Sequence, residues 1–271
     1  GCASAIAKNV FDALGAETHV INNTPDGLNI NTNCGSTHIE GLQKYVLENH
    51  LDVGFAYDGD ADRCLAVDER GELIDGDQIM AVCAEYLTAQ GKLRSEGFVA
   101  TVMSNLGLHK FCEENHLKLL CAAVGDRNVL ELMQKESMVL GGEQSGHIIF
   151  LEHMTTGDGQ LAALQFLSIL GQSGKKASEL AGQITHYPQL LQNVKVGSNE
   201  EKTAILNSAE LSMIVAREEE KLAGHGRILL RASGTEPLIR VMAEADTQDL
   251  AELVVKPLVQ AVENIQKILN K

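Results

Sequence analysis

Three aspartates at alternate positions, Asp58, Asp60 and Asp62, follow a nearly apolar run, and Arg63 comes directly after them. Alternate residues of an extended segment point the same way, so a bent loop brings the three carboxylates together. Like charges held this close repel, and one carboxylate takes up a proton unless a cation balances them. Oxygen ligands suit Mg²⁺, which keeps coordination positions for water or a phosphate oxygen. This stretch therefore predicts a loop at the end of a strand that holds Mg²⁺.

An EF-hand calcium loop is one alternative, because the aspartate spacing fits it and Glu69 falls at its twelfth position. That loop needs glycine at its sixth position, where this chain has Arg63, and helices on both sides, where this chain has strand-like patterns. A solvated acidic turn is the other alternative. The position at a strand end and the adjoining Arg63 favour the metal site over both.

Composition excludes several classes of protein. The 271 residues carry a formal net charge of −15, and 44% of them are hydrophobic, so cores are expected and nucleic-acid binding is not. The six cysteines form no CxxC pair, which indicates reduced thiols in a cytoplasmic protein. No signal peptide and no apolar run of about 18 residues occur, so no membrane partner is expected. The first residue is Gly1, which suggests a fragment or a processed form.

The hydrophobic pattern divides the chain into three predicted domains, 1–72, 73–184 and 185–271. The first two alternate helix and strand patterns, which is typical of α/β domains with mixed sheets and flanking helices. The third has a strand, a helix, two strands around a tight loop and a long amphipathic helix with an interior Pro257. We therefore expect an α/β fold that ends in a small α+β domain.

The first domain is expected to contain four elements: a helix over 6–14, a strand over 18–22, a helix that starts with a capping box of Thr37 and Glu40, and a strand over 51–57. A helix so close to the start suggests a βαβ unit without its first strand. The capping box accounts for this stretch without a catalytic pair of Ser36 and His38. In the second domain, Asp75 is expected to cap a helix, and a strand is expected over 137–140.

A second loop, "GGEQSGH" at 141–147, has glycines that let the backbone turn sharply and approach a ligand. Glu143 and Ser145 alternate, so both can face one pocket and bind sugar hydroxyls. Because histidine is the residue type whose side chain most often serves as an acid or base near neutral pH, His147 is a candidate for that role, although a lone histidine is more often structural. Arg127, in "VGDRN", is either a phosphate contact or a surface arginine at the start of a helix.

A third loop, "RASGTEPLIR", contains Arg231, Ser233, Gly234 and Thr235. A guanidinium fork, two hydroxyls and free backbone N–H groups match a phosphate dianion. Arg240 offers a second fork or faces solvent on its strand. The loop therefore predicts a phosphate-binding site, with an ordinary turn as the alternative.

The motifs "DGDADR", "GGEQSGH" and "RASGTEPLIR", in this order and at these separations, resemble the α-D-phosphohexomutase superfamily. The resemblance covers essentially the whole chain and includes "NTNCGSTH", "IDGDQIM" and "TTGDG". Within the superfamily, the chain is most similar to bacterial members that interconvert glucosamine 6-phosphate and glucosamine 1-phosphate on the route to cell-wall precursors. Gln144 carries this distinction, because relatives acting on mannose and glucose phosphates more usually have methionine there.

The resemblance implies four domains around one cleft and a phosphoserine that exchanges its phosphoryl group with the sugar phosphate through a bisphosphate. Matching the motifs assigns roles by position: Mg²⁺ ligands Asp58, Asp60 and Asp62; Arg63 beside the metal; sugar contacts Glu143 and Ser145; His147 as proton acceptor; phosphate contacts Arg231, Ser233, Gly234 and Thr235; and Arg127 as a further substrate contact. The family's metal loop often reads DGDGDR, and Ala61 replaces its second glycine here.

The family's serine loop, of the type T-A-S-H-N-P, does not occur in these 271 residues. The chain by itself is therefore expected not to perform the mutase cycle, while keeping parts of the metal, sugar and phosphate sites. Its expected partners are the phosphosugar and a serine domain, with a homodimer left open. Two alternatives remain: an enzyme of the phosphomannomutase/phosphoglucomutase type, and a non-catalytic fragment that binds sugar phosphates.

Overall fold

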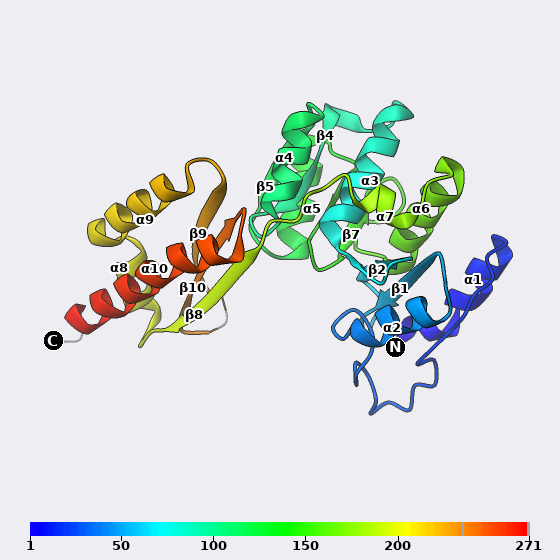
Figure 1. Ribbon diagram of the computed structural model, residues 1–271, viewed down its shortest axis with the longest axis horizontal. Coiled ribbons are helices and arrows are strands. Elements are labelled where there is room, and N and C mark those ends of the chain that lie inside the picture. The colour runs from blue at the N-terminus through cyan, green and yellow to red at the C-terminus, as the bar shows by residue number, and fades with distance from the viewer. Residues whose placement is uncertain (235, 270–271) are drawn as a thin grey trace. The chain divides into compact units, whose positions relative to one another are not determined.

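The computed structural model describes residues 1–234 and 236–269. The chain forms two compact units, Gly1–Thr185 and His186–Lys271 (Figure 1). Within the described residues, no helix has the length and apolar character needed to cross a lipid bilayer. Within the described residues, the first unit contains two sheets and two hydrophobic clusters, and the second contains one of each.

The first sheet of the first unit is an antiparallel meander of β1 (Val53–Tyr57), β2 (Cys64–Asp68) and β3 (Leu73–Ile74). The β1–β2 ladder runs from Val53 opposite Asp68 to Tyr57 opposite Cys64. This register fixes both ends of residues 58–63, because they connect the last paired residues of the hairpin. The prediction of a strand that ends at the aspartates is confirmed.

The elements that precede this sheet are η1 (Cys2–Ala5), α1 (Ala7–Ala13) and α2 (Glu40–Glu48). The predicted strand over 18–22 is wrong, because β1 pairs only with β2 and no described segment offers those residues a ladder partner. The predicted capping box is also wrong. The helix begins at Glu40, its N-cap Ile39 has no side-chain cap, and His38 belongs to a separate turn in which its N–H donates to the Gly35 carbonyl.

A four-stranded mixed sheet follows, in the order β5-β4-β6-β7. Its strands are β4 (Gly97–Thr101), β5 (Lys118–Ala122), β6 (Leu140–Gly142) and β7 (Ile148–Phe150). β4 pairs in parallel with β5 and β6, whereas β6 and β7 form an antiparallel hairpin. The strand predicted over 137–140 begins only at its last residue, because the preceding residues leave α5 through a turn. The mixed sheet confirms the predicted fold class.

The helices that follow the first sheet are α3 (Gly76–Ala89), η2 (Arg94–Glu96), α4 (Leu106–Glu114), α5 (Asp126–Glu136), α6 (Gly159–Ser173) and α7 (Ala177–Ala181). α3, α4 and α5 pack against the four-stranded sheet, whereas α6 packs against β1, β2 and α3, and α7 against β2 and α3. A capping box of Asp75 and Gln78 closes the start of α3, as predicted for Asp75. One apolar core extends from β2 to β4 and includes the fully buried Phe98. Phe55 of β1 lies edge-on to Phe166 of α6, with ring centroids 6.2 Å apart. The residues of the first two predicted domains therefore share one core.

The second unit has an antiparallel sheet in the order β8-β10-β9. Its elements are β8 (Gln189–Lys195), α8 (Asn199–Leu206), α9 (Ala209–Leu222), β9 (Gly226–Ala232), β10 (Leu238–Ala245) and α10 (Gln248–Leu269). α10 buries a stripe that includes Ala251, Val254, Leu258 and Val262 against this sheet, which is the core of the unit. The predicted α+β arrangement is present, with α8 as an additional helix.

Candidate functional site

The acidic loop, residues 58–63, brings three carboxylates to one point. One oxygen from each of Asp58, Asp60 and Asp62 lies within 4.8 Å of the other two. Asp58 is buried, Asp62 is half-buried and Asp60 is exposed, so the group is open to solvent on the Asp60 side. The β1–β2 hairpin produces this convergence, because it holds both ends of the loop in place.

Arg63 balances part of the negative charge. Its Nε donates to Asp58 Oδ2 at 2.8 Å and to Asp62 Oδ1 at 3.4 Å, and its backbone N–H donates to Asp58 Oδ1 at 3.2 Å. Burial tends to raise the pKa of Asp58, but hydrogen bonds with Asp62 and Arg63 and the charge of Arg63 lower it overall. Asp58 is therefore held as a carboxylate at neutral pH.

Asp62 has the opposite shift. Burial raises the pKa of Asp62, and its hydrogen bond to Asp58 and the charges of Asp58 and Asp60 raise it further, while His147 opposes them. One guanidinium thus does not neutralise three carboxylates. A hard divalent cation at their common point fits this set of oxygen donors, and the exposed Asp60 side leaves room for an oxygen from a ligand.

Ala61, the residue that replaces the family's glycine, has a φ of 63°. This left-handed conformation costs an alanine roughly 1 kcal/mol, because its Cβ approaches the following carbonyl, whereas glycine adopts it freely. Alanine is thus less suited to this position than glycine. The backbone path that gathers the aspartates is therefore imposed by the hairpin rather than by local preference.

The sugar loop, residues 141–147, joins β6 to β7 and docks by its backbone on the acidic loop. The Cys64 N–H donates to the Gly146 carbonyl at 3.0 Å, and Arg63 forms an isolated antiparallel bridge with His147. Gly146 has a φ of +94°, and a Cβ there would lie 2.2 Å from the Cys64 carbonyl oxygen. Only glycine permits this approach, which places the two predicted loops side by side.

His147 is buried, with 3% of its surface exposed. Its Nε2 accepts a hydrogen bond from the Gly157 N–H at 3.1 Å and lies 3.7 Å from Asp62 Oδ2. In the neutral ring this bond assigns the proton to Nδ1, which has no partner among the described residues. A proton acceptor needs a free lone pair, so the predicted role of His147 requires the Gly157 bond to open. That role stays a prediction.

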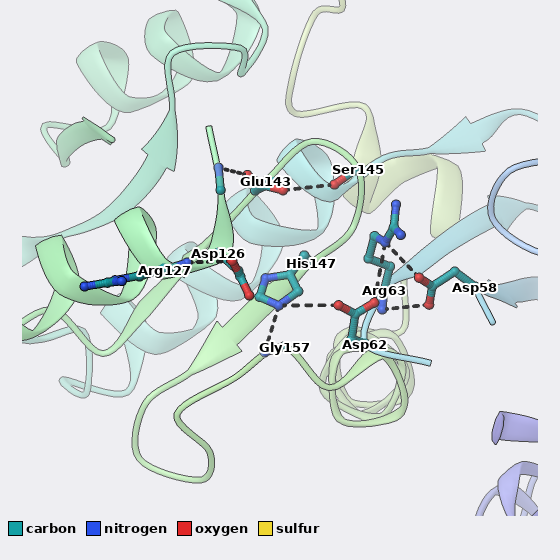
Figure 2. Close-up of polar contacts among 10 residues, drawn as sticks. Asp58, Asp62, Arg63, Asp126, Arg127, Glu143, Ser145, His147 and Gly157 are labelled. Atoms are coloured by element: carbon teal, nitrogen blue, oxygen red, sulfur yellow. Dashed lines mark hydrogen bonds and ion pairs between the residues drawn. The ribbon is translucent and has the colours of Figure 1, made fainter. Parts of the chain in front are cut away.

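Glu143 and Ser145 lie on the same loop, next to the acidic group (Figure 2). Glu143 Oε1 accepts from the Gly125 N–H at 2.8 Å, and the Ser145 hydroxyl donates to Glu143 Oε2 at 3.4 Å. Glu143 is half-buried and Ser145 exposed, so both can meet a ligand. A carboxylate and a hydroxyl held in this way suit the hydroxyl and amino groups of a sugar.

Two other residues of this region lie away from the group. Arg127 lies in the first turn of α5 with an exposed side chain, its Nε donates to Glu131 Oε1 at 2.7 Å, and it extends away from Glu143 (Figure 2). Gln144 points toward α3, where its Nε2 donates to Asp75 Oδ2 at 3.0 Å. The structure thus does not bring Arg127 to the site. Gln144 holds the sugar loop to the N-terminal end of α3.

In the second unit, two arginines face each other, and no carboxylate of the described residues forms an ion pair with either. Arg231 of β9 lies directly opposite Arg240 of β10. The Nε atom of each is buried and has no hydrogen-bond partner among the described residues. Desolvation and the charge of Arg240 lower the pKa of Arg231. Both arginines are half-buried, and two like charges held this close are unfavourable alone, so this geometry suits a bound anion.

The loop that follows Arg231 continues this cationic surface. Ser233 is buried, and its hydroxyl accepts from the Glu236 N–H at 3.2 Å. Gly234 is exposed, and a Cβ added there would meet nothing within 4 Å, so a ligand has access to its backbone. Thr235, the fourth predicted phosphate contact, lies outside the described residues.

Sequence reasoning missed the backbone donors Gly125 and Gly157, which hold Glu143 and His147. A backbone N–H has no signature in a sequence, because every residue but proline supplies one. Gly157 does lie in the "TTGDG" stretch that contributes to the family resemblance. The sequence leaves two roles open for Arg240, a phosphate contact or a solvent-facing residue, because only the strand register shows that it lies opposite Arg231.

Sequence models of three domains of one family match the chain in order. Residues 1–71 match "Phosphoglucomutase/phosphomannomutase, alpha/beta/alpha domain II", and residues 75–187 match alpha/beta/alpha domain III. Residues 191–261 match the C-terminal domain of the same family. Together these matches cover the acidic loop, the sugar loop and the arginine pair.

Curated relatives are similar over nearly the whole chain. The phosphoglucosamine mutase of Ligilactobacillus salivarius (strain UCC118) is 50% identical over 263 residues, which are 97% of this chain and 58% of the relative. The phosphoglucosamine mutase of Carboxydothermus hydrogenoformans is 52% identical over 265 residues, 98% of this chain and 59% of the relative. The chain therefore spans less than two thirds of the length of these relatives.

Solved structures agree on the fold. An N-acetylphosphoglucosamine mutase of Aspergillus fumigatus, crystallised with GlcNAc-6P and magnesium, gives a TM-score of 0.77 at 21% identity over 97% of this chain and 60% of that chain. A phosphoglucomutase/phosphomannomutase family protein of Burkholderia thailandensis also gives 0.77 at 21% identity, over 98% of this chain and 58% of that chain. At this identity the likeness concerns the fold alone.

Proposed function

Because this chain belongs to the phosphoglucomutase/phosphomannomutase family of α-D-phosphohexomutases, we propose that it is the C-terminal portion of a phosphoglucosamine mutase. The activity proposed for the whole protein is the interconversion of glucosamine 6-phosphate and glucosamine 1-phosphate, an intramolecular phosphoryl transfer that supplies amino-sugar precursors. The proposal places it in the cytoplasm, and the free state of all six cysteines is consistent with a reducing compartment.

The observation that carries the proposal is the docking of the sugar loop on the acidic loop. The Cys64–Gly146 backbone bond and the Arg63–His147 bridge join a carboxylate cluster to a loop that presents Glu143. Phosphoryl transfer to a sugar hydroxyl needs these two functions next to each other, one for charge and one for orientation. Either loop alone has ordinary structural explanations.

Asp58, Asp60 and Asp62 are proposed to hold Mg²⁺, which fits because three hard oxygen donors converge and one side is open. When bound, Mg²⁺ supplies charge stabilisation to the oxygens of the transferring phosphoryl group. Arg63 keeps Asp58 ionised and fixes its orientation. Glu143, held by Gly125, and Ser145 are proposed to bind and orient the sugar. His147, proposed as the proton acceptor, must first lose its bond to Gly157.

Arg231, Arg240, Ser233 and the Gly234 backbone are proposed to bind the phosphate that does not react. Two guanidiniums with no acidic partner among the described residues attract a dianion and fix it through paired N–H···O bonds. We propose that the phosphoryl-carrying serine belongs to a further domain of the whole protein, because the 271 residues contain no loop of that type. The chain is then a binding partner for that domain and inactive without it.

Two measurements on the 271-residue chain test the proposal. Isothermal titration should show binding of glucosamine 6-phosphate that is tighter with Mg²⁺, and weaker binding of mannose 6-phosphate and glucose 6-phosphate. An assay with glucosamine 6-phosphate and a catalytic amount of glucosamine 1,6-bisphosphate should show no turnover. Robust turnover would refute the need for a serine domain. Equal binding of the three hexose phosphates would favour the broader phosphomannomutase/phosphoglucomutase activity, and no binding would remove the proposal.

A further inference from the structure

Lys202 is a buried lysine on α8 that neither a motif nor a family resemblance singles out. It has 7% of its surface exposed and lies on the core-facing side of the helix, one turn before the fully buried Ile205. Lysine is rarely buried without a charged partner. Among the described residues no carboxylate pairs with Lys202, so its ammonium group stays uncompensated by an acid.

Its contacts are two backbone carbonyls of the predicted phosphate loop. Lys202 Nζ donates to the Ser233 carbonyl at 2.7 Å and to the Glu236 carbonyl at 3.2 Å. Ser233 precedes Gly234 and Glu236 follows it two positions later, so one ammonium group holds the backbone on both sides of Gly234. A neutral apolar side chain in this position would fill the core without the cost of burying a charge.

The bond to Ser233 also sets the direction of a donor. In a planar trans peptide, the carbonyl of one residue and the N–H of the next point in opposite directions. Holding the Ser233 carbonyl toward Lys202 therefore turns the Gly234 N–H away from it. That N–H has no partner among the described residues, and Gly234 is exposed. The peptide after Glu236 has no N–H to orient, because Pro237 follows.

We propose that Lys202 is a positioning residue for phosphate binding: from beneath the loop it directs the Gly234 N–H to the ligand and adds a positive charge behind the site. The inference rests on the proposed function, which makes this loop the phosphate site. Lys202 acts through Ser233 and Glu236 and need not touch the ligand. Its charge acts together with Arg231 and Arg240, which offer the direct contacts.

The test uses inorganic phosphate and glucosamine 6-phosphate as probes of the 271-residue chain. Lys202→Met should weaken the binding of both by about tenfold and make it less sensitive to salt. Lys202→Gln keeps N–H donors for the carbonyls without the charge, so it should recover part of the affinity. Lys256→Met is the matched control, because it removes the same charge from an exposed position on α10 and should leave the affinity unchanged.

A purely structural lysine would lower the thermal midpoint and leave the affinity of the folded protein unchanged, and that result would overturn the inference. If both Lys202 variants fail to fold, an NMR titration of the wild-type chain with inorganic phosphate provides the test. Phosphate should then shift the Gly234 amide and the Lys202 side-chain signals together, and a shift of Gly234 alone would contradict the proposal. If the wild-type chain binds no phosphate, the result would instead contradict the proposed phosphate site, on which the role of Lys202 rests.

Discussion

The acidic loop of the first unit and the arginine pair of the second both gather like charges, but the fold balances them differently. Three carboxylates converge within the 58–63 loop, and Arg63 from the same loop neutralises part of their charge. Arg231 and Arg240 face each other with their Nε atoms buried and without partners among the described residues. The charge of the first cluster is therefore partly balanced within its own loop, whereas the second has no counter-charge among the described residues.

The β9–β10 ladder also contains a cross-strand pair whose charges are balanced, and this pair can be compared with the two arginines. Arg227 lies opposite Glu244, and their side chains form an ion pair at 2.5 Å with Glu244 fully buried. Arg231 lies four residues further along the same strand and on the same face, opposite another arginine. One cross-strand pair is thus complementary and structural, and the other is repulsive and suited to binding. Residue type alone does not separate them.

The largest expected effect compares these two arginines. Arg227→Met should destabilise the chain by about 3–5 kcal/mol, because it leaves the buried Glu244 without its main cation. Arg231→Met removes the same charge from the same strand but relieves repulsion, so stability should be unchanged or slightly higher. Chemical denaturation measures both. Inorganic phosphate should bind Arg231→Met at least about tenfold more weakly than wild type. Equal destabilisation by the two changes would show that Arg231 is structural.

The second expected effect concerns the acidic loop. Asp60→Asn should lower the affinity for Mg²⁺ on the order of 100-fold, because Asp60 is the exposed one of the three carboxylates proposed as Mg²⁺ ligands. Without metal, the same change should raise stability by a few tenths of a kcal/mol, since one repelling charge is lost, roughly as for other exposed charge pairs. Titration with Mg²⁺ and thermal melting in EDTA measure these effects. Asp52→Asn, at an exposed site outside the loop, is the control. Unchanged Mg²⁺ affinity in Asp60→Asn would contradict the metal site.

The third expected effect concerns the contact between the β2–β3 turn and helix α7 in the first unit. Glu69, in the β2–β3 turn, accepts from the Ser178 hydroxyl at 2.5 Å and from the Ser178 N–H at 3.1 Å. Burial tends to raise the pKa of Glu69, but the two Ser178 bonds lower it overall below its usual 4.5. A lowered folded pKa means stability that is complete above the unfolded value and is lost as pH falls through the folded value.

Glu69→Gln should therefore cost about 1–2 kcal/mol at pH 7, and the difference from wild type should shrink as the pH falls below about 4.5. Denaturant curves at a series of pH values measure it. Glu72→Gln removes a charge from an exposed position in the same turn and should show almost no pH-dependent difference. A constant difference across the pH series would mean that the carboxylate charge of Glu69 has no part in the contact.

The smallest effect concerns Ala61 in the acidic loop. Ala61→Gly should raise stability by up to about 1 kcal/mol, because the left-handed φ of 63° strains alanine and not glycine, although glycine also loses more chain entropy. Thermal melting measures this change. Ala56→Gly, in the middle of β1, should destabilise instead and serves as the control. Destabilisation at both positions would indicate that the loop has another backbone conformation.

Local patterns predicted most of the elements, and failed where a strand or cap depended on distant residues. Asp75 caps α3 as its sequence indicates, because the box is closed by Gln78 three residues later. Residues 18–22 have strand-like composition but form no strand, because a strand exists only where another segment pairs with it. Thr37 matches a cap pattern, yet the nearby turn that holds His38 moves the helix start to Glu40.

The sequence by itself determined the chemistry of the three loops, because residue type and spacing decide which groups are available: alternate carboxylates, a glycine-flanked Glu and Ser, and an arginine beside hydroxyls. Only the tertiary structure decided which groups are balanced and which are free for a ligand. Gly146 lets its loop dock on a loop about 80 residues earlier in the chain, the strand register places Arg231 against Arg240 rather than an acid, and helix α8 brings Lys202 to the carbonyls of the predicted phosphate loop. These are contacts between distant segments, and they exist only after the strands pair and the cores close.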